Sequence, residues 1–165
     1  MKAYKFKIKR PTKAIVAKFE NTLDCARELY NCALQERIGA WKERQISITR
    51  FDQDKQLPAI KECRTEYLNV YSQVLQDVLK RLDKTFKSFF LRIKKGVKAG
   101  FPRFKGKNFF DSFCYPQSGF RLDGNNLYLS KIGKVKVHLS QNMLGLVKTF
   151  RLLTNEIIEK QNHKV

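Results

Sequence analysis

The sequence predicts an α+β fold, in which a small antiparallel β-barrel or sheet carries an inserted α-helical bundle. Residues 3–9 alternate apolar and basic side chains, and this period of two is typical of a strand. Apolar residues at helical spacing then continue to about residue 95, and the period of two returns after Gly100. Because the order is strand, helices, strands, the simplest arrangement pairs the first strand with the last ones.

The first helical segment follows Pro11, which ends the strand, and Thr12, which offers an N-cap. We expect it to run to about Arg44 with a break near residues 20–22. Its spacing indicates one apolar face directed at a core. The residues on that face are Leu23, Ala26, Leu29, Tyr30, Ala33, Leu34, Ile38 and Trp41.

Two further helical segments are predicted. Residues 46–68 indicate two short helices, because Pro58 lacks a backbone donor and favours the start of a helix. The pattern from Ser72 to about Lys95 is the clearest in the chain, with one apolar stripe that we expect to be buried. The stripe consists of Val74, Leu75, Val78, Leu79, Leu82, Phe86, Phe89, Phe90 and Ile93.

The last third of the chain is predicted to form short strands. An Asp-Gly-Asn-Asn sequence between two of them is typical of a hairpin turn. The candidate strands lie at 111–116, 119–122, 126–129, 134–139 and 146–152. The predicted division is a first barrel strand at 1–10, an inserted helical domain at 11–98, the remaining barrel at 99–150 and a tail at 151–165.

The charge of the chain predicts a polyanionic partner. Its 165 residues are 42% hydrophobic, and 34 Lys or Arg against 15 Asp or Glu give a formal net charge of +19. Such an excess on a folded domain favours nucleic acid. No apolar run approaches the roughly 18 residues of a spanning helix, and the N-terminus lacks the apolar block of a signal peptide. We therefore expect a cytoplasmic protein without a membrane partner.

Metal, cofactor and catalytic sites are not predicted. No two of the four cysteines form a C-x-x-C pair, and both histidines are far from them in sequence. Glu62 and Glu66 lie one helical turn apart, which a charged surface explains better than a two-metal site. No phosphate-binding glycine loop and no Ser, His and Asp arrangement is present. The chain by itself is expected not to be an enzyme.

The candidate nucleic-acid-binding residues lie in two stretches. Residues 80–98 hold eight Lys or Arg and one Asp, which repel one another unless an anion lies along them. In 100–107, basic side chains suit phosphates and phenylalanine rings suit bases. The alternatives are a merely solvated helix face and rings that only fill the core. The predicted residues are Gln73, Gln76, Lys80, Arg81, Lys84, Lys87, Arg103, Lys105 and Lys107, with Phe101 and Phe104 as stacking rings.

Four stretches in the same order resemble the N-terminal half of TnpB, the OrfB-type protein of insertion sequences, which is similar to type V CRISPR effectors. They are YNCALQER at 30–37, SQVLQDVLKRLDKTFKSFF at 72–90, GFPRFKGK at 100–107, and the segment from SFCYPQ to KVKVHL at 112–139. The resemblance extends from about Tyr4 to Thr149.

The resemblance implies a part of an RNA-guided DNA endonuclease system linked to transposition in a prokaryotic cytoplasm, near the nucleoid when bound to DNA. It implies a wedge β-barrel interrupted by a helical recognition domain, with guide RNA and target DNA as partners. The glutamine and lysine face of 72–90 would meet target-adjacent DNA or the heteroduplex, and 102–107 would meet phosphates. Tyr4, Lys5 and Lys7 would lie on the first wedge strand.

The sequence departs from this family after Thr149, where neither the acidic RuvC triad nor the four-cysteine zinc ribbon follows. Since phosphodiester cleavage needs carboxylates to hold metal ions, we expect binding without cleavage. Two alternatives remain open. The chain could be one part of a split or frameshifted endonuclease, with a separate RuvC-domain polypeptide as a partner, or a nuclease-dead DNA-binding regulator.

Overall fold

The computed structural model describes residues 6–138 and 148–153. The order of elements is strand, helices, strands, and the α+β class predicted from the sequence is confirmed. The helical elements are α1 (Lys13–Arg44), α2 (Arg50–Cys63), the 3₁₀ helix η1 (Thr65–Asn69), α3 (Ser72–Lys94) and the 3₁₀ helix η2 (Lys107–Phe109). The strands are β1 (Lys7–Ile8), β2 (Ser112–Tyr115), β3 (Phe120–Asp123), β4 (Asn126–Leu129), β5 (Gly133–His138) and β6 (Phe150–Leu153).

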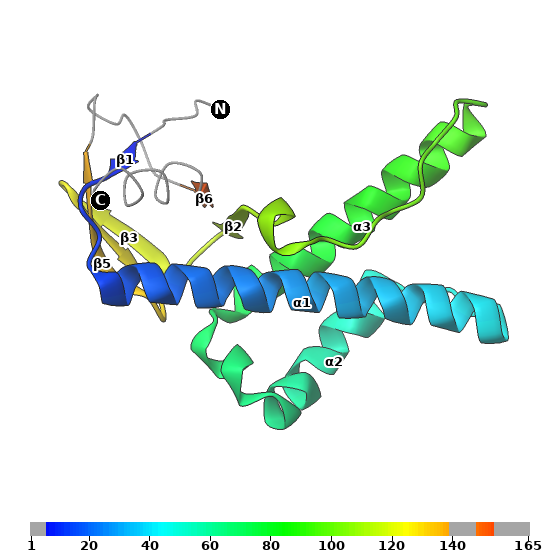
Figure 1. Cartoon of the computed structure of the whole chain (residues 1–165), viewed down its shortest axis with the longest axis horizontal. Helices are drawn as coiled ribbons and strands as arrows, with labels where there is room; N and C mark the ends of the chain where they lie inside the picture. Colours follow the sequence, from blue (N-terminus) through cyan, green and yellow to red (C-terminus); the bar gives the residue numbers. More distant parts are fainter. Residues whose placement is uncertain (1–5, 139–147, 154–165) are drawn as a thin grey trace.

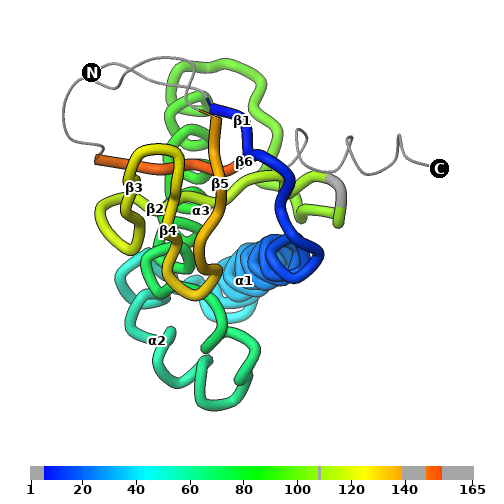
Figure 2. The backbone as a smooth tube through the Cα atoms, turned by 90° about the vertical axis from the view of Figure 1, so that its left-hand side faces the viewer, coloured from blue at the N-terminus to red at the C-terminus, as the bar shows by residue number. Residues whose placement is uncertain are grey.

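The strands form two antiparallel sheets rather than the predicted barrel. One sheet has the order β1-β5-β4-β3, which Figure 2 shows side by side, and the other pairs β2 with β6. Within the described residues the edge strands β1 and β3 have no partner in the smaller sheet, so the two sheets are not closed. β1 pairs with β5, so the first strand joins a strand that follows the helices in the chain.

The predicted hairpin is confirmed as the connection between β3 and β4. Asp123 pairs with Asn126, so Gly124 and Asn125 form a two-residue turn. Gly124 has a φ of +50° and Asn125 does not have a positive φ, which are the φ signs of a type II′ turn with glycine at its first central position. Burial alternates along the neighbouring β5, with its valines inward and its lysines outward.

The core joins the helices to the sheets. Five residues of α3 from Val74 to Leu82 are buried against α1, as predicted. Phe19 of α1 lies 6.1 Å from Phe113 of β2 between ring centroids. Figure 1 shows the sheets at the N-terminal end of α1, and α3 extending away from α1 at the other end.

Two helix predictions are wrong. The break expected at 20–22 does not occur, and α1 continues through it. The buried Thr22 hydroxyl donates a hydrogen bond to the Lys18 carbonyl at 2.8 Å, so this polar group has its partner within the helix. Pro58 lies inside α2 rather than at the start of a second helix, and η1 follows as a separate 3₁₀ turn. Proline has no backbone N–H, so one carbonyl in the preceding turn of α2 loses its helical partner. Because Pro58 is exposed, that carbonyl can bond to solvent instead.

The apolar faces of α1 and α3 also extend beyond the core. Trp41 is 55% exposed, Phe90 59% and Ile93 52%, although all three were expected to be buried. All three residues lie in the last turns of α1 and α3, and the C-terminal ends of these two helices diverge, so neither helix covers the other there (Figure 1). Within the described residues, no helix combines the length and the hydropathy that a membrane crossing requires.

Candidate nucleic-acid interface

A basic cleft of about 470 Å³ lies along one face of α3. The α3 residues that line it are spaced by three and four positions, so a continuous helix places them on one side. Strand β6 contributes one further arginine from a distant part of the sequence. The lining residues are Arg81, Lys84, Thr85, Ser88, Arg92 and Arg151.

The surroundings of the cleft are strongly cationic. Residues 84–110 contain nine Lys or Arg and neither Asp nor Glu. Four of the six lining residues are cationic, and none is acidic. Like charges on neighbouring side chains repel one another, and the negative phosphates of a nucleic acid would relieve this repulsion. Binding would also release counterions from the nucleic acid, which favours the complex.

Arg81 fixes the position of the cleft relative to the smaller sheet. Its Nε donates to Asp77 Oδ2 at 2.7 Å, and its Nη1 donates to the Ser112 carbonyl of β2 at 2.8 Å. The side chain is about three-quarters buried. Arg81 therefore ties α3 to β2, and part of its charge is already paired within the protein.

The other predicted residues on α3 are divided between solvent and protein contacts. Lys84 lines the cleft, while Lys80 and Gln76 are exposed on α3 outside its lining. Lys87 is 78% exposed, although its Nζ lies 2.8 Å from Asp83. Gln73 accepts a hydrogen bond from the Ser118 backbone at 3.3 Å, so its side chain contacts the loop before β3.

The segment 100–107 lies partly against α1. The Asn31 side chain makes two hydrogen bonds to the backbone of Lys105. Its Oδ1 accepts from the Lys105 N–H at 2.8 Å, and its Nδ2 donates to the Lys105 carbonyl at 2.9 Å. Arg103, Phe104 and Lys107 are exposed. This anchoring presents their side chains to solvent from a fixed backbone.

The remaining sequence candidates are less central. Phe101 packs against Phe86 and Phe89 with ring centroids 5.8 and 5.2 Å away. Lys7 is exposed on β1, and Tyr4 and Lys5 lie outside the described residues.

Sequence reasoning missed Arg92 and Arg151, which both line the cleft. The spacing of Arg81, Ser88 and Arg92 places them on the face that already held Lys84, so helical periodicity could have added Arg92. Nothing in the sequence could have placed Arg151, because the pairing of β6 with β2 brings it to α3.

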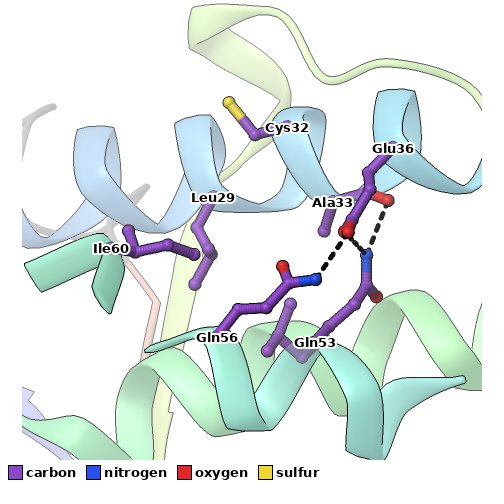
Figure 3. Close-up of a pocket in the computed structure, with 8 residues that line it drawn as sticks. Leu29, Cys32, Ala33, Glu36, Gln53, Gln56 and Ile60 are labelled. Carbon is purple, nitrogen blue, oxygen red and sulfur yellow. Dashed lines mark hydrogen bonds between the residues drawn. The ribbon is translucent and has the colours of Figure 1, made fainter. Parts of the chain in front are cut away.

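A second pocket, of about 200 Å³, lies between α1 and α2 (Figure 3). Its polar groups bind one another, since Gln53 and Gln56 each donate to the Glu36 carboxylate at 2.7 Å. Gln53 also donates to the Ala33 carbonyl at 2.9 Å. The network joins the two helices, and we assign the pocket no ligand.

The four cysteines do not form a cluster. All four are free, and within the described ranges no three His, Cys, Asp or Glu side chains are grouped as metal ligands. Burial raises the pKa of the Cys25 thiol to about 11, with a smaller contribution from the nearby carboxylate of Glu28. Burial raises the pKa of Cys114 as well.

Sequence comparisons relate the chain to known proteins. The family HTH_OrfB_IS605, described as a helix-turn-helix domain, matches residues 1–45. A relative from Escherichia coli (strain K12), named "Putative RNA-guided DNA endonuclease InsQ", is 40% identical over 79 residues, covering 47% of this chain and 18% of the relative. A relative from Streptomyces pristinaespiralis, named "Putative RNA-guided DNA endonuclease", is 31% identical over 135 residues, covering 79% of this chain and 32% of the relative.

The family match and the relatives together support a transposon-encoded nucleic-acid-binding protein. The same matches support a TnpB-type, or OrfB-type, insertion-sequence protein. It spans a third or less of the length of the curated relatives it matches. Within the matched N-terminal region, the described residues form β1 and the single uninterrupted helix α1, not a pair of helices joined by a turn.

Proposed function

We propose that the basic cleft and the exposed lysines beside it hold the phosphate backbone of a guide RNA and its target DNA, and that this chain binds them without cutting. The observation that carries the proposal is the convergence of four cationic side chains from α3 and β6 on one cleft that no acid lines. Phosphate contacts of this kind supply most of the sequence-independent affinity for nucleic acid.

The fixed position of the cleft favours binding to a regular backbone. Arg81 is held by Asp77 and by the Ser112 carbonyl of β2, and β2 pairs with β6, so Arg151 on β6 is tied to α3 through β2. Lys84, Arg92 and Arg151 are exposed and can each contact a phosphate oxygen. We further propose that the two sheets are parts of one wedge domain and that 11–98 is its helical insertion, which the pairing of β1 with β5 supports.

Salt dependence tests the electrostatic part of the proposal. The dissociation constants for a structured RNA hairpin and for a DNA duplex are measured by fluorescence anisotropy at increasing KCl concentrations. For about six phosphate contacts on B-form DNA, we expect a log–log slope near −5. A slope near zero would contradict binding through phosphates.

Charge reversal tests the choice of surface. The triple variant Lys84→Glu, Arg92→Glu, Arg151→Glu should weaken binding to both probes at least tenfold and make the salt dependence shallower. The matched control is a triple reversal of Lys13, Lys42 and Lys55, which are exposed lysines on α1 and α2 with the same total change of charge. Equal losses in both variants would show that only net charge matters and that the cleft is not the site.

Incubation of the pure chain with single-stranded and duplex DNA in Mg²⁺ or Mn²⁺ tests the second half of the proposal. We expect intact DNA after times at which the binding is complete. Metal-dependent scission that survives further purification would contradict a chain that only binds.

A further inference from the structure

Four phenylalanines form a cluster where α3 extends beyond the core, and we call Phe86, Phe89, Phe90 and Phe101 the ring cluster. The edge of Phe101 meets Phe86 and Phe89 at interplanar angles of 86° and 80°. Phe89 and Phe90 lie 5.2 Å apart between centroids. The segment after α3 therefore folds back and holds the rings together at the end of the helix (Figure 1).

The described part of the chain covers the ring cluster only in part, since Phe86 and Phe89 are half-buried while Phe90 and Phe101 are exposed. Phe90 is 59% and Phe101 49% exposed, and Leu91, Ile93 and Val97 beside them are also about half exposed. Apolar area left in water forgoes about 25 cal/mol per Å². A contiguous exposed patch of this kind marks a surface that another molecule covers.

Charge limits what that molecule can be. The exposed side chains around the rings include Lys94, Lys95, Lys98 and Arg103, and no acid occurs from residue 84 to residue 110. The occupant must therefore offer negative charges together with flat apolar faces. Bases on a phosphate backbone offer both, and base stacking on aromatic rings tolerates any sequence.

The ring cluster is also continuous with the basic cleft. Phe89 lies four residues after Thr85 and three before Arg92, which both line the cleft, and side chains at these spacings are neighbours on the surface of a helix. A strand whose phosphates lie in the cleft would reach the rings by crossing the side of a single helix. A base paired within a duplex presents no free face, so only unpaired bases could stack there.

We propose that the ring cluster stacks unpaired bases of a nucleic-acid strand whose phosphates occupy the basic cleft. The proposal rests on the proposed function of the cleft and adds a preference for single-stranded segments. A lipid surface with anionic headgroups would share the charge and the apolar contact, and the experiment separates the two.

The test measures the binding of three probes to the full chain. The first is a twelve-nucleotide oligothymidylate, the second an abasic strand with the same number of phosphates, and the third a phosphatidylglycerol vesicle. We expect the oligothymidylate to bind at least fivefold more tightly than the abasic strand, because each stacked base contributes about 1–3 kcal/mol. Equal affinity for the two strands would overturn base stacking while leaving phosphate binding in place. If neither strand bound in a salt-dependent way, the proposed function would itself fail.

Single-ring variants locate the effect. Phe90→Leu keeps an apolar side chain but removes an exposed ring, so it should abolish most of the difference between the two strands and leave abasic binding unchanged. The matched control is Phe51→Leu, since Phe51 is 66% exposed on α2 and lies under Arg50 at 4.6 Å but is followed by Asp52. Vesicle binding that Phe90→Leu abolishes, with no difference between the strands, would assign the cluster to a membrane surface and overturn the proposal.

Discussion

At the residue scale, the interior of the helical part depends on one buried arginine. The Arg37 side chain is 8% exposed, and its Nε donates to Gln53 Oε1 at 2.9 Å. Its Nη1 lies 3.5 Å from Asp83 of α3, and its guanidinium lies over the Phe86 ring at 5.2 Å. Burial lowers the pKa of Arg37 and the Asp83 carboxylate opposes that shift, so the charge is retained by its partners.

We predict that Asp83→Asn lowers the free energy of unfolding by about 2 kcal/mol, because it leaves Arg37 charged, buried and without a counterion. The cost is smaller than the roughly 3–5 kcal/mol for a fully buried pair, since Asp83 is 20% exposed. Urea unfolding followed by circular dichroism measures the change. Lys87→Gln removes the exposed partner of the same carboxylate and should change stability by less than about 0.5 kcal/mol. Equal losses in the two variants would contradict the importance of the buried pair.

The cysteines allow a second prediction about single residues. Cys32 and Cys63 are exposed, whereas Cys25 and Cys114 are buried with raised pKa values. Because the thiolate is the reactive form, we expect an aromatic disulfide reagent near neutral pH to modify two thiols rapidly and two only after unfolding. Serine variants of Cys32 and Cys63 should remove the fast phase. A fast reaction of all four native thiols would show that α1 and β2 are less closely packed than described.

At the element scale, α2 begins with a capping box. Thr49 Oγ1 accepts from the Asp52 backbone N–H at 3.3 Å, and Asp52 Oδ2 accepts from the Thr49 N–H at 2.9 Å. Hydrogen bonds from the Thr49 side chain and then its backbone lower the pKa of Asp52. A carboxyl whose pKa is lowered by folding stabilises the folded state above its unfolded pKa, and this stabilisation is lost as the pH falls through the folded pKa.

We predict that Asp52→Ala destabilises the protein near neutral pH and that the difference from the wild type shrinks on acidification to about pH 2.5. Urea midpoints of both proteins at several pH values measure this difference. Glu62→Ala, at the opposite end of α2 where it cannot cap, should cause no such loss near neutral pH. A destabilisation by Asp52→Ala that is constant down to acidic pH would mean that the carboxylate charge is not what caps the helix.

Local pattern predicted the elements better than it predicted their ends. The stripe of α3 and the β3–β4 hairpin follow from periodicity and turn chemistry, both of which are local. The continuity of α1 through Thr22 and the position of Pro58 depend on packing and solvent exposure, which residue preferences do not contain. The exposure of Phe90 could not be predicted either, because periodicity shows which face is apolar but not where the covering helix ends.

At the scale of the whole molecule, sequence separation limited what could be foreseen of the site. The lysines of α3 were predictable because they lie on one helix. Arg151 and the anchoring of Lys105 by Asn31 depend on contacts between segments far apart in the chain. The barrel was predicted from the order of the strands along the chain. That order does not specify which strands pair, so it could not show whether the edge strands of the sheet would close it.

A tight contact between Tyr71 and Gly119 is among those that join the helices to the sheets. Tyr71 stacks on Tyr115 with centroids 5.4 Å apart, and its hydroxyl lies 2.9 Å from Ser118 Oγ. Gly119 has a φ of +81°, and a Cβ there would overlap the Tyr71 ring. The fit of this glycine against the ring therefore couples the start of α3 to the loop before β3.

We predict that Gly119→Ala lowers the free energy of unfolding by about 2 kcal/mol or more, because it adds an overlap with Tyr71 to a backbone conformation that itself costs about 1–2 kcal/mol in an alanine. Gly124→Ala, with a φ of +50° and no atom within 4 Å of the new Cβ, should show only the backbone cost. Far-ultraviolet circular dichroism follows the helices, and near-ultraviolet circular dichroism follows the stacked tyrosines. Since the core is continuous from helices to sheets, both signals should shift together in Gly119→Ala. A tyrosine transition that moves while the helical transition stays in place would show that the helices fold independently of the sheets.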